Sequence, residues 1–208
     1  MKTSSLAIPV LVLLAGCGSL FKTTEVMPTV YELRAPTPEP AASRLPATLI
    51  VARPRTRPGL ATDRIAVTLA DRRLDAYGGS RWSAPLPELV SSLLIAGLRG
   101  SAGWQAVVPE RSAFGGEYLL QPEIEAFEAD YSGGGGPPTV RVHLRGELGL
   151  VNERRMLAIV EGSAEVRAGA DRQRDVTAAF ESAYAKAATQ MIGAINTAAH
   201  SGPEPAAR

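Results

Sequence analysis

Apolar and polar residues alternate along Val140-Arg141-Val142-His143-Leu144-Arg145-Gly146-Glu147-Leu148-Gly149-Leu150. Because successive side chains of a strand point to opposite faces, this pattern predicts a strand with one buried and one solvated face. After a turn at Asn152-Glu153-Arg154, the run from Met156 to Val166 alternates in the same way. The two runs are therefore expected to pair as long antiparallel strands, with opposite charges meeting on the solvated face.

A third long strand is predicted just before this pair, from Tyr118 to Tyr131. Its apolar residues change parity between Ile124 and Phe127, which predicts a β-bulge near Ala126. Shorter strands are predicted over residues 48–52, 65–69, 73–77 and 104–108. The first of these is wholly apolar, as is typical of a central strand, and the next two are expected to form a hairpin that ends at Gly78-Gly79.

Two amphipathic helices are predicted from apolar stripes at helical spacing, over residues 86–98 and 176–198. Ser83 is the expected N-cap of the first helix, and Asp175 or Thr177 that of the second. The order strands, helix, strands, helix predicts an α+β fold, with a mainly antiparallel sheet and two long helices packed on one face.

The N-terminus has the pattern of a secretory signal. Residues 6–15 are apolar, follow the single charge of Lys2, and form a run shorter than the roughly 20 residues of a membrane span. The run ends at Leu14-Ala15-Gly16-Cys17, which resembles the bacterial lipobox. The resemblance implies cleavage before Cys17 and lipid on its thiol. A plain signal peptide with a chance cysteine is the alternative.

The lipobox also implies a location in the cell envelope. Two or more acyl chains anchor a protein stably, so lipidation of Cys17 is expected to hold the chain on a membrane. Gly18 stands where an Asp tends to retain enterobacterial lipoproteins in the inner membrane. We therefore expect a lipid anchor in the inner leaflet of the outer membrane, with the folded part in the periplasm.

The expected division of the chain has four parts. They are a signal peptide (1–16), a lipidated N-terminus with a Pro-rich tether (17–46), an α+β domain (47–200) and a disordered tail (201–208). Within the tether, Val30-Tyr31-Glu32-Leu33 is either a short strand docked on the domain or ordinary linker.

The composition argues against nucleic-acid binding, catalysis and metal binding. The 22 Lys and Arg balance 21 Asp and Glu, so there is no general attraction to nucleic acid. Cys17 is the single cysteine, and the two histidines, His143 and His200, are expected on a solvated face and in a fraying helix end. These residues do not supply a nucleophile with its base, or an ordinary zinc set. We expect no enzymatic activity, no metal, and no cofactor beyond the covalent lipid.

Charged side chains outside the long pair suggest surface roles. Glu123 and Glu125 are predicted to share one face of their strand and Glu128 to point the other way, as solvated partners of Arg141 and Arg145. The loop Arg53-Pro54-Arg55-Thr56-Arg57 carries three arginines and is either a basic contact patch for a partner or an ordinary solvated loop.

Several short motifs occur in a particular order along the chain. After the lipobox come Tyr31-Glu32-Leu33, Arg64-Ile65, Leu74-Asp75-Ala76-Tyr77 and Arg81-Trp82-Ser83-Ala84-Pro85-Leu86. This order resembles the ABC-type transport auxiliary lipoproteins, which are similar to the lipoprotein subunit of the paraquat-inducible (Pqi) system. The resemblance covers residues 17–199, and its specificity comes from the order of the motifs.

The resemblance implies a role in transport. Such lipoproteins work beside an MCE-domain protein, a permease and an ATPase that move phospholipids or other hydrophobic molecules between two membranes. The chain itself contains no ATPase motif. Tyr77 and Trp82 are each either structural residues or contacts for the MCE partner. A structural or assembly lipoprotein of the outer membrane, unrelated to lipid traffic, is the alternative function.

Overall fold

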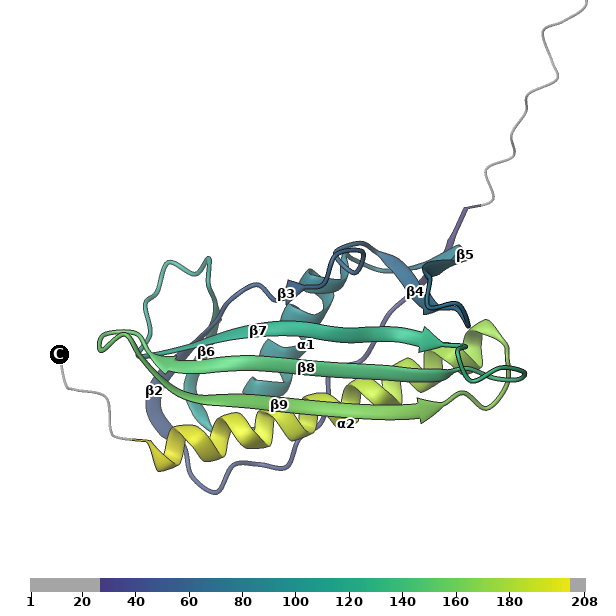
Figure 1. The fold of residues 1–208 in the computed structure, drawn as a ribbon. Coiled ribbons are helices and arrows are strands. Elements are labelled where there is room, and N and C mark those ends of the chain that lie inside the picture. The colour runs from purple at the N-terminus through teal and green to yellow at the C-terminus, as the bar shows by residue number, and fades with distance from the viewer. Residues whose placement is uncertain (1–26, 203–208) are drawn as a thin grey trace, which may run out of the picture.

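A computed structural model describes residues 27–202 as one sheet covered on one face by two helices (Figure 1). The strands are β1 (Thr29–Tyr31), β2 (Leu45–Val51), β3 (Arg55–Thr56), β4 (Arg64–Thr68), β5 (Leu74–Trp82), β6 (Trp104–Pro109), β7 (Tyr118–Asp130), β8 (Thr139–Leu150) and β9 (Arg155–Arg167). The helices are α1 (Leu86–Gly100), which packs on β6, and α2 (Gln173–Ser201), which packs on β8 and β9. No helix in this part of the chain is long and apolar enough to span a membrane.

The long strand β7 organises the nine-stranded sheet. One edge of β7 pairs along its whole length with β8, which in turn pairs with β9, and both pairings are antiparallel. The other edge pairs in succession with β2, β3 and β4, all parallel to it. Further parallel pairs join β1 to β5 and β2 to β6. The prediction of an α+β fold is confirmed, but the sheet is mixed and not mainly antiparallel.

Several local predictions are confirmed. The β4–β5 hairpin turns at Ala70-Asp71-Arg72, with Arg72 at φ 65°. The register of β7 against β8 shifts between Ile124 and Ala126, which is the expected bulge. Strand β2 lies between β7 and β6, and its residues Leu49 and Val51 are buried, as expected of a central strand.

Both helix starts differ from prediction. Pro85 is the N-cap of α1 and Arg172 that of α2, and neither makes a side-chain cap. The backbone N–H of Ser83 instead donates to the carbonyl of Tyr31, which holds Ser83 beside the end of β1. The Thr177 hydroxyl lies inside α2 and donates back to the Gln173 carbonyl.

Strand β5 also differs from prediction. It continues through Gly78-Gly79 to Trp82 because β1 pairs with its last residues.

The Pro-rich segment lies on the domain where the structure describes it. Strand β1 contains Val30 and Tyr31, so the docked-strand alternative is correct. Leu33 is buried, and the Ala41 N–H donates to the Ser101 carbonyl at 2.8 Å. Gly97 on α1 leaves room for the Pro36 ring, which would lie 2.7 Å from an added Cβ. The part of the expected tether between residues 29 and 46 therefore contacts the domain at several points.

Helix α2 approaches the sheet most closely at Gly162 of β9. A Cβ at this position would lie 1.9 Å from the carbonyl oxygen of Ala187 on α2. The inner face of β8 and β9 can meet the α2 backbone here only because Gly162 has no side chain.

We predict that Gly162→Ala lowers the free energy of unfolding by about 3 kcal/mol or prevents folding, because α2 must move away from β9. Gly193→Ala, on the exposed side of α2 with no neighbouring atom within 4 Å, is the matched control. It should raise stability by about 0.5–1 kcal/mol through helix propensity. Chemical denaturation followed by circular dichroism measures both, and equal effects would contradict the close approach.

Candidate functional site

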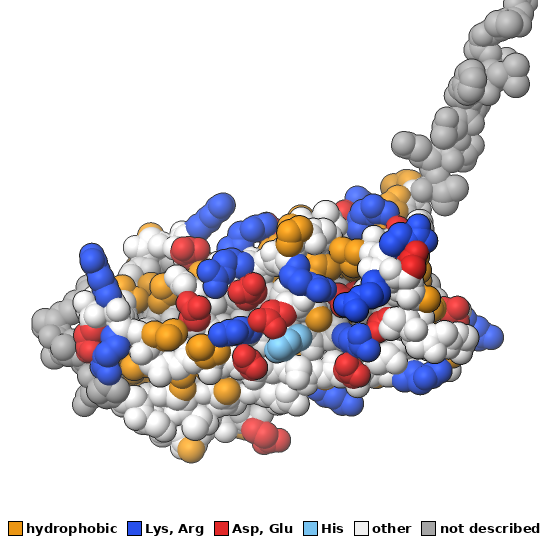
Figure 2. Space-filling model, viewed as in Figure 1, with side chains coloured by type: hydrophobic (Ala, Val, Ile, Leu, Met, Phe, Trp, Pro, Cys, Tyr) orange, Lys and Arg blue, Asp and Glu red, His pale blue; other side chains and the backbone are white. Residues whose placement is uncertain are grey.

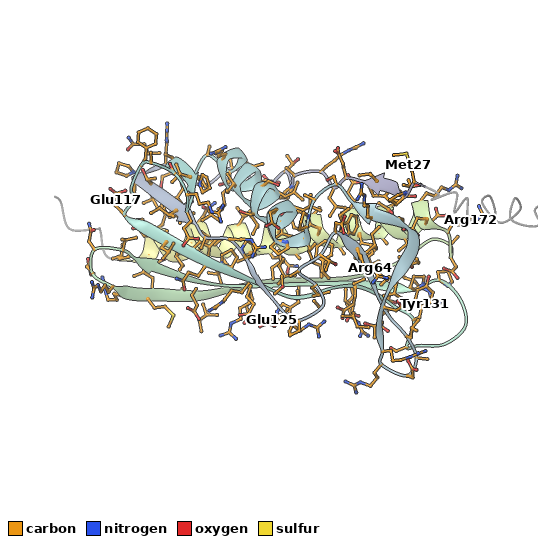
Figure 3. All side chains as sticks on the ribbon, turned by 90° about the horizontal axis from the view of Figure 1, so that it is seen from above. Met27, Arg64, Glu117, Glu125, Tyr131 and Arg172 are labelled. Carbon is orange, nitrogen blue, oxygen red and sulfur yellow. The ribbon has the colours of Figure 1, made fainter. Side chains whose placement is uncertain are left out.

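The candidate site is the sheet face that the helices leave uncovered, called here the outer face. Figure 2 views this face, on which acidic and basic side chains lie side by side over β7, β8 and β9. Figure 3 shows Glu125 projecting from this face on the side opposite the helices. The strand register places the outer side chains in rows across the three strands.

The middle rows alternate in charge. Arg145 lies opposite Glu123 on one side and Glu161 on the other, and Arg141 lies in the same way between Glu128 and Glu165. Cross-strand ion pairs form between Arg141 and Glu165 at 3.1 Å and between Arg145 and Glu161 at 3.9 Å. The prediction that opposite charges meet across β8 and β9 is confirmed. At this exposure each pair contributes under about 1 kcal/mol.

The bulge in β7 corrects the prediction for the acidic residues. It adds one residue between Ile124 and Phe127, both of which face the core, so Glu128 lies on the outer face with Glu123. The partners of these carboxylates also differ from prediction. Glu123 pairs with Arg55 at 3.5 Å, Glu125 with His143 at 3.0 Å and Glu128 with Arg57 at 2.7 Å.

The three-arginine loop lies beside the outer face and is charge-balanced. Arg55 and Arg57 extend to β7 through the ion pairs just described, whereas Arg53 turns to α1 and pairs with Glu88 at 2.9 Å. Two of the three arginines therefore contribute to the outer face. This surface is a mosaic of both charges, so of the two interpretations of the loop the structure gives no support to a purely basic patch.

His143 lies in the middle of the charged rows. Its Nδ1 is 3.0 Å from a Glu125 oxygen and its Nε2 is 3.8 Å from Glu161. Within residues 27–202, no group of three or more His, Cys, Asp or Glu side chains is arranged to hold a metal ion. His200 instead binds backbone carbonyls, those of Asn196 at 2.7 Å and Ser43 at 3.0 Å.

Trp82 belongs to the core and not to the surface. Its side chain is 1% exposed, and its ring packs edge-on against Phe127 and Phe180, at centroid distances of 5.9 and 5.2 Å. The Trp82 N–H donates to the Asp63 carbonyl at 2.7 Å, which holds the end of β5 beside the loop before β4. The structure therefore supports the structural interpretation of this residue.

Tyr77 joins a short hydrogen-bond chain at the edge of the β4–β5 hairpin. The Tyr131 hydroxyl donates to Asp171 at 2.5 Å, and the Tyr77 hydroxyl lies 2.7 Å from that of Tyr131. Burial, together with the bonds to Asp171 and Tyr77, raises the pKa of the Tyr131 hydroxyl well above its usual value of 10.0. This chain ties the hairpin, β7 and the β9–α2 loop together, and it leaves Tyr77 half-buried.

Cys17 lies outside the described residues, and its role stays a prediction. The structure does add a residue that the sequence gave no reason to select, the carboxylate of Asp130 at the end of β7. Asp130 is 5% exposed, and it accepts bonds from Arg141 at 2.5 Å and from the Ser132 N–H at 2.7 Å. Periodicity could not have indicated Asp130. It lies in a hollow between the β4–β5 hairpin and the outer face, and this surrounding exists only in the folded protein.

The fold and the site together define an α+β domain with one sheet face that the helices leave uncovered. The family model of the ABC-type transport auxiliary lipoprotein component matches residues 31–192, well over half of the chain. The chain belongs to this family, as the order of its motifs suggested.

Solved structures agree on the fold. A Xanthomonas campestris protein of the family DUF330 has a TM-score of 0.76 and 24% identity, and the match covers 83% of this chain and 97% of that one. An uncharacterized protein has a TM-score of 0.61 and 17% identity, with 81% and 99% covered. No curated protein sequence matches the chain.

The pair of Asp130 with Arg141 predicts an acid-sensitive stability. Burial raises the pKa of Asp130, but the bonds from Ser132 and the charge of Arg141 outweigh burial and hold it below 3.8. A lowered folded-state pKa gives stability that is complete above the unfolded-state pKa of about 3.9 and is lost as the pH falls through the folded-state value.

We expect Asp130→Asn to lower the free energy of unfolding at pH 7 by about 1–3 kcal/mol, and the difference from wild type to shrink below about pH 3. Asp71→Asn removes an exposed carboxylate that pairs with Arg73 and serves as the control, with a change under about 0.5 kcal/mol. Urea titrations at both pH values measure this, and a difference that stays constant with pH would contradict the assignment.

Proposed function

We propose that this protein is a lipid-anchored periplasmic accessory subunit of an ABC transport system with an MCE-domain component. In such a system, a permease and an ATPase drive the movement of lipids or other hydrophobic solutes between two membranes. The observation that carries the proposal is the family match over residues 31–192. The lipobox ending at Cys17 supports the anchor, and Gly18 supports the outer membrane as its location.

The mode of action that we propose is docking to the MCE partner and not catalysis. The outer face supports this because it is an open sheet surface whose charges are already arranged in complementary pairs. A surface with both charges contributes more to the specificity of binding, through charge complementarity with the partner, than to the binding affinity. The permease and the ATPase are expected to associate through the MCE protein.

The anchor is tested at Cys17. We expect Cys17→Ala to abolish incorporation of an alkyne-bearing fatty acid and to leave the signal peptide uncleaved, because the thiol is the attachment atom. Gly18→Asp keeps the thiol and is the control, which should still incorporate the label. Click detection after metabolic labelling gives the readout, and normal labelling of the alanine variant would rule out the lipobox.

The partner is tested by co-purification. The full-length lipoprotein, extracted from membranes in mild detergent, should capture the MCE-domain protein and, through it, the permease. The Cys17→Ala protein should capture less, because it is not held on the correct membrane. A structural lipoprotein unrelated to lipid traffic would instead capture none of these components and leave lipid distribution unchanged on deletion.

A further inference from the structure

One end of the outer face is apolar. In the row nearest the β8–β9 turn, the register aligns Leu119 of β7, Gly149 of β8 and Met156 of β9. In the next row, Ile159 lies beside Glu147. The outer face thus changes from paired charges to apolar side chains along the same three strands.

Gly149 makes this end concave. It has no side chain, and the Leu119 and Met156 side chains stand on either side of it, around a hollow of about 290 Å³ that Val151 also lines. The position requires glycine, because a Cβ would lie 2.8 Å from the Arg155 carbonyl oxygen. The hollow is therefore a consequence of the strand pairing.

The apolar side chains at this end are exposed to an unusual degree. Val151 is 39% exposed, Ile159 49% and Met156 59%, although each is a large hydrophobic residue. Contiguous exposed apolar surface with a polar margin marks interaction sites in soluble domains. We call Leu119, Gly149, Val151, Met156 and Ile159 the apolar zone.

The charges around the apolar zone indicate what it binds. Arg155 pairs with Glu153 at 2.7 Å, whereas Arg154, which also lines the hollow, has no ion-pair partner in residues 27–202. A ligand with a carboxylate beside an apolar group could pair with Arg154 and cover the apolar zone at the same time.

The position of the zone favours a protein over the anchoring membrane. The described chain begins at β1, beside β5, at the end of the molecule opposite the β8–β9 turn (Figure 1). The lipid attachment proposed at Cys17 precedes that end in the sequence, whereas the apolar zone lies at the opposite end of the domain.

We propose that the apolar zone is the docking point for the MCE partner, which inserts one bulky apolar side chain over Gly149 and places a carboxylate against Arg154. This inference rests on the function proposed above. It adds the surface on this subunit and the chemistry of the partner segment that binds there.

The test is capture of the MCE protein by full-length, lipidated variants. Met156→Glu/Ile159→Glu should reduce capture at least tenfold, and so should Arg154→Glu, which lies in an exposed turn where no packing is lost. Val30→Glu is the matched control: it charges another strand residue that is 49% exposed, at the opposite end of the domain, and should capture normally. A photo-crosslinking amino acid at position 156 should label the MCE protein, and one at position 30 should not.

The outcomes separate the two proposals. If wild-type protein captures no MCE protein, the proposed function fails and the docking point with it. If wild type and all variants capture equally, the docking point alone is wrong. Self-crosslinking from position 156 would show a contact between copies, and loss of vesicle binding by the variants would show a membrane contact; either result with normal capture overturns the proposal.

Discussion

Each residue of β7, β8 and β9 can face the helices or the solvent but not both, and this constraint determines the rest of the molecule. Helix α2 seals the inner face so closely that Gly162 must lack a side chain. The alternate side chains of these strands are therefore confined to the outer face, where most polar groups are at the surface and only a few, such as Asp130, are buried. The site is thus a direct consequence of how the core is closed.

Local sequence patterns were sufficient to predict the elements that form between neighbouring residues. Alternation predicted the β8–β9 pair and the β4–β5 hairpin, helical spacing predicted both helices, and the structure confirms all of them. The parallel pairs of β1, β2, β3 and β4 join segments distant in sequence, and no local pattern specifies their register. The start of α1 differs because a backbone bond from the Leu86 N–H to the Thr62 carbonyl takes the place of a side-chain cap.

The residues of the candidate site were also harder to predict, because their positions depend on contacts between distant segments. The sequence predicts the bulge near Ala126, yet the predicted position of Glu128 does not count the extra residue that this bulge adds, and the register with β8 corrects it. Trp82 was left between two roles because its motif does not say which face it occupies, and Phe127 and Phe180 settle this only in three dimensions. The apolar zone likewise needs three strands in register around Gly149 before it exists.

The geometry also bears on where a partner must come from, given an anchor at Cys17. The ten residues from 17 to 26 span at most about 35 Å when fully extended. Helix α2, with 29 residues, is about 44 Å long and runs along the domain toward the β8–β9 turn (Figure 1). An anchor at Cys17 would thus hold β1 near its membrane, and the domain is long enough for its opposite end, with the apolar zone, to lie well away from that membrane. Under the function proposed above, a partner bound to the apolar zone would approach from the opposite membrane, which is the arrangement that transport between two membranes requires.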